Sequence, residues 1–262
     1  MADYVWHGIN GQNAHYYDPA AWTVDGAAAA KPPGPGDTVT LRFPGPGGHP
    51  VFVAPGAKKG DVVSGQTLNV GVTGTARQRV ADFNGTILEP STTANVTGLA
   101  QAGVQGSTGW NGVVNVGTPA GSADLQPVLS GSIRRLDGKV NELVNAGTVN
   151  VANASKLDLS ARTGLTAMPD FSTGLVFLVD SMPHHFDAHN DGTINVSGGS
   201  LLTYDDPTKT GGVYFNRFIN HGAIRVQGGA GRTNKVRLDA HLIGPGTIEM
   251  DGGDAAKASK RC

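Results

Sequence analysis

The stretches "NAGTVNV" (residues 145–151), "NDGTINV" (190–196) and "NHGAIRV" (220–226) are versions of one pattern. Each begins with asparagine, a variable residue and glycine, and continues with apolar residues at alternate positions. Alternation with a period of two is typical of a β-strand that buries one face. Glycine and asparagine are typical turn residues. The pattern therefore predicts a turn followed by a short strand, repeated along the chain.

The repeats are unevenly spaced, because their glycines are Gly147, Gly192, Gly222 and Gly246. Weaker relatives are "DFNGTIL" from Asp82 and "GWNGVVNVG" from Gly109. Similar strands joined by connections of variable length are typical of a solenoid, in which each coil buries its apolar residues against its neighbours. In such coils the glycine takes a tight or positive-φ turn position, and the asparagine amide satisfies the turn backbone. We predict an all-β, single-stranded parallel β-helix (β-solenoid).

The composition supports a core of small side chains, because the 262 residues include 39 glycines and only 6% aromatics. We expect an N-terminal cap and first strands over 1–45, coils of irregular length over 46–252, and a polar tail over 253–262. The stretch "SIRRLDGKVNELV" (132–144) has apolar residues near helical spacing, interrupted by Gly138. It is either a helix or one more coil.

The N-terminal region holds two of the three tryptophans and a pair of adjacent tyrosines, and we expect these residues to cover the first coil of the solenoid. These residues are Trp6, Tyr16, Tyr17 and Trp22. A solenoid's first coil otherwise exposes unpaired strand edges and an apolar end. The alternative is an aromatic platform on which a sugar stacks.

Charge and cysteine content limit the classes of partner and site. The formal net charge is -1 and the basic residues are scattered, so we expect no nucleic-acid partner. The single cysteine, Cys262, allows no internal disulfide and no cysteine-based zinc site. The start "MADYVWHGIN" lacks a Sec-type signal, and no segment has the apolar length of a membrane span. We expect an extracellular or cell-surface location, reached by non-Sec export, after removal of a signal, or as part of a virion.

The stretch "HHFDAHND" (184–191) is the main candidate for a metal site. In an extended strand Phe186 and Ala188 share one face, and His185, Asp187 and His189 share the other. Three such ligands on one face could converge on zinc or another transition metal. The alternative is a solvated polar rim, because the stretch runs directly into the repeat "NDGTINV".

Two packing expectations accompany that candidate site. Phe186 is expected at the apolar position that Leu143 and Phe218 hold in the sister coils. His221 is expected to stack one coil away from Asp191, which would extend a polar stripe along the surface.

The sequence gives little support for other metal sites or for a catalytic site. Asp180, Asp205 and Asp206 could form an oxygen-rich calcium site, or could lie in a solvated loop. A "GxSxG" elbow is absent, and no carboxylate is singled out by its context as a catalytic acid or base. We therefore expect no catalytic residues and no resident cofactor beyond a possible zinc or calcium ion, and we favour a protein that is not an enzyme.

The opening "W…DPAAWTVDG…PPGPGDTVTL" resembles the segment that begins β-helical passenger regions of autotransporter-like bacterial surface proteins. The units "NAGTVNV", "NDGTINV" and "NHGAIRV" resemble the coils of the same proteins. The resemblance covers the opening and the C-terminal part of the chain, and the middle matches only loosely. It implies a passenger-type solenoid without implying one activity, since such scaffolds carry many functions.

Three functions follow as hypotheses. The first is a non-enzymatic structural or adhesive module, extracellular or at the cell surface, that self-associates into filaments or matrix or binds cell-surface or matrix polysaccharide. The second is a phage tailspike-like or lyase-like β-helix that binds or cleaves polysaccharide. The third, ranked last, is ice or mineral binding by a flat threonine face, because no regular T-x-T ladder is visible apart from "DTVTL" at Asp37.

Overall fold

The computed structural model describes residues 1–7, 17–42, 62–63, 65–71, 87–104, 107–117, 121–129, 141–159, 162–163, 185–204, 215–228, 233–238 and 241–251. Within these ranges the regular structure is β-strand, apart from one short 3-10 helix, η1 (Pro19–Ala21). No helix in this part of the chain is both long and apolar enough to cross a membrane. The all-β prediction is confirmed.

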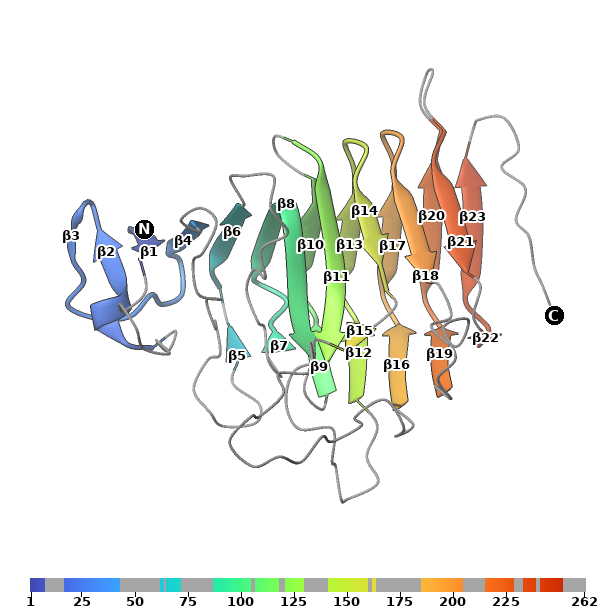
Figure 1. Cartoon of the computed structure of the whole chain (residues 1–262), viewed down its shortest axis with the longest axis horizontal. Coiled ribbons are helices and arrows are strands. Elements are labelled where there is room, and N and C mark those ends of the chain that lie inside the picture. The colour runs from blue at the N-terminus through green and yellow to red at the C-terminus, as the bar shows by residue number, and fades with distance from the viewer. Residues whose placement is uncertain are drawn as a thin grey trace, which may run out of the picture.

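The strands stack in three long parallel rows (Figure 1). The first row contains β4 (Thr38–Arg42), β6 (Thr67–Gly71), β8 (Thr93–Val104), β10 (Val113–Val116), β13 (Thr148–Val151), β17 (Thr193–Val196), β20 (Ala223–Gln227) and β23 (Thr247–Asp251). The second row contains β11 (Ala123–Leu129), β14 (Lys156–Asp158), β15 (Arg162–Thr163), β18 (Leu201–Tyr204) and β21 (Lys235–Leu238). The third row contains β5 (Val62–Val63), β7 (Ile87–Leu88), β9 (Ser107–Trp110), β12 (Asn141–Asn145), β16 (His185–Asn190), β19 (Phe215–Asn220) and β22 (His241–Ile243).

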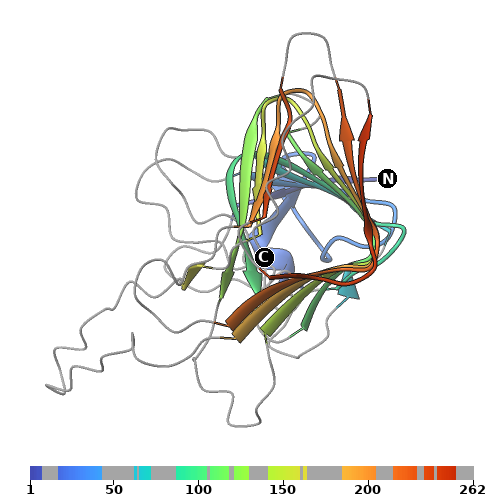
Figure 2. The ribbon, with the colours of Figure 1, turned by 90° about the vertical axis from the view of Figure 1, so that its right-hand side faces the viewer.

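The chain visits these rows in the same order in successive coils, as in β12, β13 and β14, and again in β16, β17 and β18. The strand β8 joins two rows, since its first half pairs with β6 and β10 and its second half pairs with β11. Viewed along the long axis, the rows surround a common interior (Figure 2). This arrangement is consistent with a β-helix.

Columns of aliphatic side chains, aligned by the strand register, fill that interior. Val114, Val149, Ile194 and Ile224 are register partners in successive coils, and each is at most 2% exposed. Because each coil adds one residue to the column, the core grows along the axis without bulky side chains. The columns explain why a chain with few aromatics still buries a continuous core.

The turn glycines lie where the coils approach one another most closely. A Cβ atom on Gly147, Gly192 or Gly222 would lie 2.0–2.1 Å from the carbonyl oxygen of the equivalent glycine in the preceding coil. None of these glycines has a positive φ. The prediction of a tight or positive-φ position is therefore met by its tight alternative, because contact between coils, rather than backbone conformation, excludes a side chain.

The asparagine that begins each repeat lies inside the turn and forms a buried ladder. Asn145 Nδ2 donates to Asn190 Oδ1 at 2.8 Å, and Asn190 Nδ2 donates to Asn220 Oδ1 at 2.7 Å. The same amide of Asn145 also donates to the backbone oxygen of Thr193. The prediction that the asparagine amide satisfies the turn backbone is confirmed.

Two alignments of the sequence are wrong. Leu143 and Phe218 are in register with Ala188, whereas Phe186, although fully buried, pairs with Asn141 and Asn216. The apolar position was misassigned because Phe186 and Ala188 both point inward, two residues apart.

The second wrong alignment concerns "DFNGTIL". Its Ile87 and Leu88 form β7 in the third row, where they pair with Gly109 and Trp110, so this stretch is not a copy of the repeated turn and strand. As for the possible helix at 132–144, Asn141–Asn145 is strand β12, and residues 132–140 lie outside the described residues.

An antiparallel hairpin lies at the N-terminal end of the first row. Strand β1 (Asp3–Trp6) pairs in parallel with β4 and antiparallel with β2 (Trp22–Val24), and β2 pairs with β3 (Ala27–Ala28). The rings of Trp6 and Trp22 meet edge to face at 4.8 Å, and Tyr4 also packs on Trp22. All three are at most 3% exposed. Trp6 and Trp22 are therefore core residues and not an open platform for a sugar, whereas Tyr17 is 42% exposed and Tyr16 lies outside the described residues.

Asp37 ties β1 to β4 and makes the N-terminal end sensitive to acid. Its carboxylate accepts hydrogen bonds from the backbone N–H groups of Gly34 and Ala2, both at 3.0 Å. The hydrogen bond from Gly34 contributes most to lowering the pKa of Asp37 below its ordinary value of 3.8. As the pH falls, the carboxyl group of Asp37 binds a proton in the unfolded chain before it does so in the folded chain. The ionised carboxylate therefore stabilises the fold fully above the ordinary pKa of 3.8, and this stabilisation is lost as the pH falls through the lowered pKa of the folded chain.

We expect the free energy of unfolding of the native chain to fall between about pH 5 and about pH 3. In Asp37→Asn this fall is expected to be shallower, because the group that binds the proton is missing. Urea unfolding at a series of pH values measures both slopes. Equal slopes for the two chains would contradict a contribution from Asp37.

The C-terminal coil exposes residues that belong to the interior columns. Leu242, Ile248 and Met250 are register partners of the buried Phe218, Ile224 and Val226, yet they are 39–48% exposed. No described strand pairs with the outer edge of β21, β22 or β23. The two ends of the described stack therefore differ, since the hairpin covers only the N-terminal one.

Candidate functional site

The stretch predicted to bind metal forms β16 in the third row. Phe186 and Ala188 point into the core, with at most 1% exposure, and Asp187 and His189 lie on the opposite face. The predicted alternation of the strand is confirmed. The side chain of His185 lies outside the described residues.

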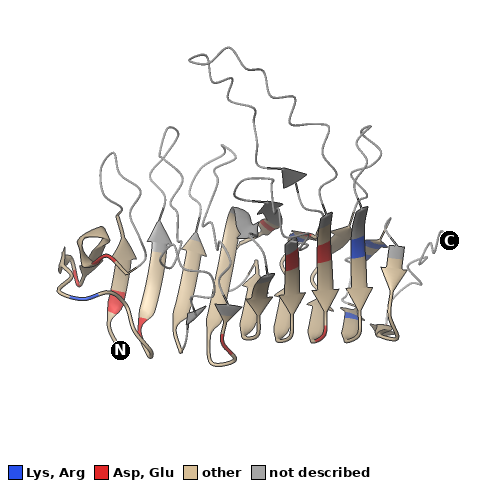
Figure 3. Ribbon diagram, turned by 90° about the horizontal axis from the view of Figure 1, so that it is seen from below, with Lys and Arg blue, Asp and Glu red and all other residues tan. Residues whose placement is uncertain are grey.

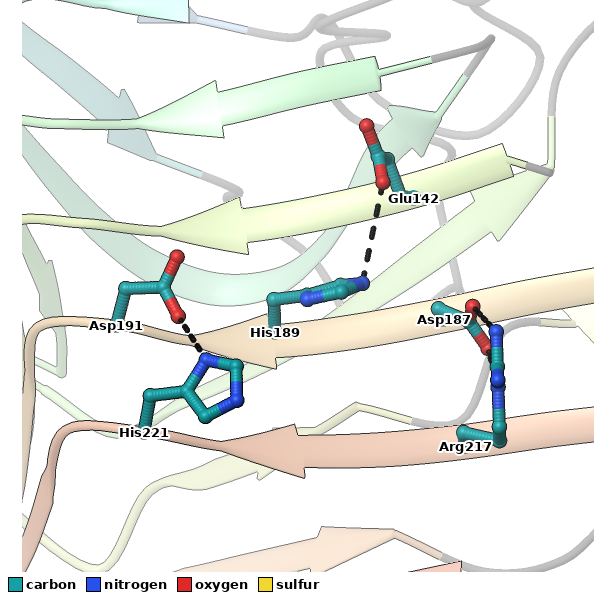
Figure 4. A network of polar contacts seen from close by, with 6 residues as sticks. All are labelled: Glu142, Asp187, His189, Asp191, Arg217 and His221. Carbon is teal, nitrogen blue, oxygen red and sulfur yellow. Dashed lines mark hydrogen bonds and ion pairs between the residues drawn. The ribbon is translucent and has the colours of Figure 1, made fainter. Parts of the chain in front are cut away.

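Asp187 is held by a cation from the next coil. Arg217 donates from both Nε and Nη2 to the two carboxylate oxygens, and the Nε to Oδ1 distance is 3.0 Å (Figure 4). The Asp187 side chain is 6% exposed and that of Arg217 is 49% exposed. The hydrogen bonds and charge of Asp187 raise the pKa of Arg217 further above its already high value. Such bidentate charge-assisted bonds are among the stronger polar contacts in proteins.

Two histidines form further pairs between adjacent coils. His221 Nδ1 lies 3.0 Å from Asp191 Oδ1, and His189 Nε2 lies 3.8 Å from Glu142 Oε2 (Figure 4). The expected contact between His221 and Asp191 is confirmed. Figure 3 shows acidic and basic bands side by side across neighbouring strands of this half of the molecule. These side chains pair one to one along a polar stripe, and we find no convergence of several of them on one point.

The metal site stays a prediction. Where side chains are described, no group of three or more His, Cys, Asp or Glu residues is placed to hold a metal ion. The calcium candidates Asp180, Asp205 and Asp206 lie outside the described ranges. Zinc titration by calorimetry, with His185→Ala and His189→Ala as controls, tests the His185, Asp187 and His189 set. Equal heats for native and variant chains would leave only the polar stripe.

The ion pair between Asp187 and Arg217 gives a prediction with a defined order of effects. We expect Arg217→Met to lower the free energy of unfolding by about 2 kcal/mol, because it leaves a carboxylate buried without its partner. Asp187→Asn is expected to cost about 1 kcal/mol or less, because the half-exposed guanidinium of Arg217 remains solvated. Urea unfolding of both variants measures the order, and an equal or reversed order would contradict this account of the pair.

The outward surface of the first row is a different kind of site, which we call the threonine–asparagine face. It consists of two rows of register partners that point away from the core, namely Thr38, Thr67, Thr93, Val113, Thr148 and Thr193, and Thr40, Asn69, Asn95, Asn115, Asn150 and Asn195. Each of these side chains is half-buried, and in the five coils from β6 to β17 the residues between and after them are buried aliphatic side chains.

The asparagine amides on this face are joined to one another. Asn95, Asn115, Asn150 and Asn195 each donate from Nδ2 to the Oδ1 of the asparagine in the preceding coil, at 2.8–2.9 Å. The chain separations of these partners are 26, 20, 35 and 45 residues. The ladder therefore runs along the molecular axis, and it fixes the orientation of every amide in it.

The face is uncharged and without aromatic rings over these six coils, and charge begins at its two ends. Asp3 is in register with Thr38 at one end. At the other end Arg225 is the register partner of Asn195 in the next coil. It forms an ion pair with Glu249, with an Nε to Oε2 distance of 3.0 Å. Only the first strand of this face was recognised from the sequence, since "DTVTL" holds Thr38 and Thr40, whereas the strings "TLNV", "TANV", "VVNV", "TVNV" and "TINV" carry the rest of the signal.

Comparison with known proteins identifies no relative. No protein-family model, no curated protein and no solved structure matches this chain.

Proposed function

We propose that the chain is a single-stranded parallel β-helix, capped at its N-terminal end by the aromatic hairpin β1–β3, which acts as a non-enzymatic adhesive or structural module outside the cell or at its surface. The repeated order of the three strand rows and the columns of register partners support the helical architecture. The aromatic packing of Tyr4, Trp6 and Trp22 supports the cap, since it covers the first coil with bulky apolar groups.

The threonine–asparagine face is the observation that carries the adhesive role. A row of five asparagines joined by hydrogen bonds, one in each coil from β6 to β17, suits contact with an extended surface better than binding of one small molecule. Each group contributes little alone, and contacts made simultaneously by many coils add to one strong attachment.

The polar stripe of the third row supports a role other than catalysis. Asp187, Asp191 and Glu142 each have a cationic or imidazole partner in an adjacent coil. A pair of carboxylates set for acid and base catalysis on a sugar would instead flank a common point.

Adhesion is tested by co-sedimentation with insoluble neutral and acidic polysaccharides and by partition into growing ice. We expect the native chain to bind at least one of these materials. The variant Thr148→Lys/Thr193→Lys, which places two charges on the face, is expected to bind about tenfold more weakly. The matched control is Val144→Lys/Ile219→Lys, which charges two half-buried outward positions of the third row and is expected to bind like the native chain.

Two results would contradict this function. One is retention on none of the materials. The other is release of reducing ends or unsaturated products from a soluble polysaccharide, which would favour the lyase-like or tailspike-like alternative.

Self-association is the structural part of the proposal, and the exposed C-terminal coil supports it. Leu242, Ile243, Ile248 and Met250 are exposed apolar residues at an end where no described strand pairs with the outer edges, and such an end favours pairing with another chain. Because the hairpin covers the opposite end, we expect pairs of chains before any filament. Light scattering over a concentration series tests this, and a monomer at every concentration would contradict it.

A further inference from the structure

We propose that the threonine–asparagine face binds ice, so that the extended surface to which it adheres is crystalline water. The inference rests on the proposed adhesive function of this face and names its ligand. It is carried by the spacing of the two side-chain rows, by the groups that they present and by the absence of charge and aromatic rings from the described positions of the face.

The two rows form a regular two-dimensional array. Along each row, successive side chains are separated by the distance between hydrogen-bonded strands, about 4.8 Å. Across the rows, residues such as Thr148 and Asn150 are two positions apart on one strand, which separates them by about 6.6 Å. Strands β10, β13, β17 and β20 run side by side in Figure 1, and side-chain ladders of this kind help to keep a sheet flat over many strands. A crystal surface can meet such an array at every coil.

The groups that the array presents are held in fixed positions. Each inner asparagine of the ladder, namely Asn95, Asn115 and Asn150, uses one N–H and one acceptor position on its neighbours, which leaves its second N–H and further acceptor capacity for the ligand. Each threonine adds one hydroxyl and one methyl group. Because β-branched threonine is stiff at χ1 and the amides are fixed by the ladder, little side-chain entropy is lost when the face meets an ordered lattice.

The composition of the face favours water over other lattices. An acidic polysaccharide or an ionic mineral would be recognised by complementary charge, and the positions from Thr38 to Thr193 carry none. A sugar surface would be met by exposed aromatic rings, and the described tryptophans, Trp6, Trp22 and Trp110, are buried. Ice needs neither feature, since its surface offers only hydrogen-bond donors and acceptors.

The test measures thermal hysteresis and the partition of the protein into a slowly growing ice front. We expect the native chain to depress ice growth and to concentrate in the ice. Thr148→Lys/Thr193→Lys is expected to lower the partition by about tenfold, and Val144→Lys/Ile219→Lys to leave it unchanged. If the lysine variant unfolds by circular dichroism, Thr148→Tyr/Thr193→Tyr replaces it, because tyrosine suits strands and its neutral ring protrudes above the face.

The outcomes separate this inference from the proposed function. Partition of the native chain no greater than that of a non-binding protein of similar size overturns ice binding, and the proposed function still stands if the chain sediments with a polysaccharide through the same face. Equal losses in the face variants and in the control also overturn the inference, because they would show that the face is not the contact.

Discussion

Replacing Gly192 by alanine is expected to lower the free energy of unfolding by about 3 kcal/mol or more, one of the two largest effects of a single substitution in this chain. The new Cβ would lie 2.1 Å from the carbonyl oxygen of Gly147, which is backbone and cannot turn aside. That oxygen also accepts the hydrogen bond from the Thr193 N–H that begins β17. Relief of the clash would therefore separate two coils where their pairing begins. Urea unfolding followed by circular dichroism measures the loss.

Gly34→Ala is the matched control. A Cβ at Gly34 meets only Asp37 Oδ2, at 4.0 Å, and its backbone is not in the left-handed region. We expect its free energy of unfolding to lie within about 0.5 kcal/mol of the native value. Equal effects of the two substitutions would mean that the close approach of the coils at Gly192 is wrong.

Replacing Asn190 by alanine is expected to cost about 3 kcal/mol, because it interrupts the buried asparagine ladder at its centre. Asn190 is fully buried and bonds to both Asn145 and Asn220, and its Nδ2 also donates to the backbone oxygen of Ala223. Its loss leaves a buried donor of Asn145 and a buried acceptor of Asn220 with fewer partners, and each such loss is expensive.

The matched control for Asn190 is Asn195→Ala, which interrupts the ladder on the outward face. Asn195 also bonds to the asparagine of the preceding coil, at 2.8 Å, but it is half-exposed, so water can replace the lost contact. We expect a cost of about 1 kcal/mol or less. A loss in Asn195→Ala as large as that in Asn190→Ala, measured by the same urea unfolding, would contradict the distinction between the inner and outer ladders.

The all-β fold with stacked parallel strands was predictable because one repeated pattern carries three physical requirements together. The glycine of "NDGTINV" is needed for close approach of the coils, its first asparagine for the ladder in the turn, and its alternating Ile194 and Val196 for the core. Each requirement places one type of residue at a fixed position relative to the glycine, and this position can be recognised in the sequence alone. A tight position and a left-handed backbone both select glycine, and the structure decides for the tight position, since the glycine contacts the preceding coil and its φ is not positive.

Register across coils was less predictable, because it depends on connections whose lengths vary. Phe186 was assigned to the column of Leu143 and Phe218 on its size, whereas Ala188 occupies that column. A small residue and a large one both suit an inward position, so hydrophobicity alone could not separate two positions that share one face. Counting back from the turn glycine does separate them, because Leu143, Ala188 and Phe218 all stand four residues before it.

Most of the threonine–asparagine face escaped the sequence prediction for a related reason. The stretch "DTVTL" supplies Thr38 and Thr40, but the later strands carry asparagine at the second position, and Asn150 and Asn195 are 45 residues apart in the chain and adjacent in space. Only the structure shows that "TVNV" and "TINV" lie in register and that their asparagines bond to each other. The contact between His221 and Asp191 was predictable because both residues belong to the turn, where the glycine fixes the alignment.

The most direct test of this account is the efficiency of disulfide formation between residues of adjacent coils, in a chain whose Cys262 is first replaced by serine. Thr148 and Thr193 are register partners. Their Cα atoms are therefore about 4.8 Å apart, within the range that a disulfide spans. Thr148 and Asn195 are offset by two residues, which places their Cα atoms about 8 Å apart and outside that range. We predict nearly complete oxidation of Thr148→Cys/Thr193→Cys and little of Thr148→Cys/Asn195→Cys, whereas equal yields, or a higher yield for the offset pair, would contradict the stacking of the coils in register.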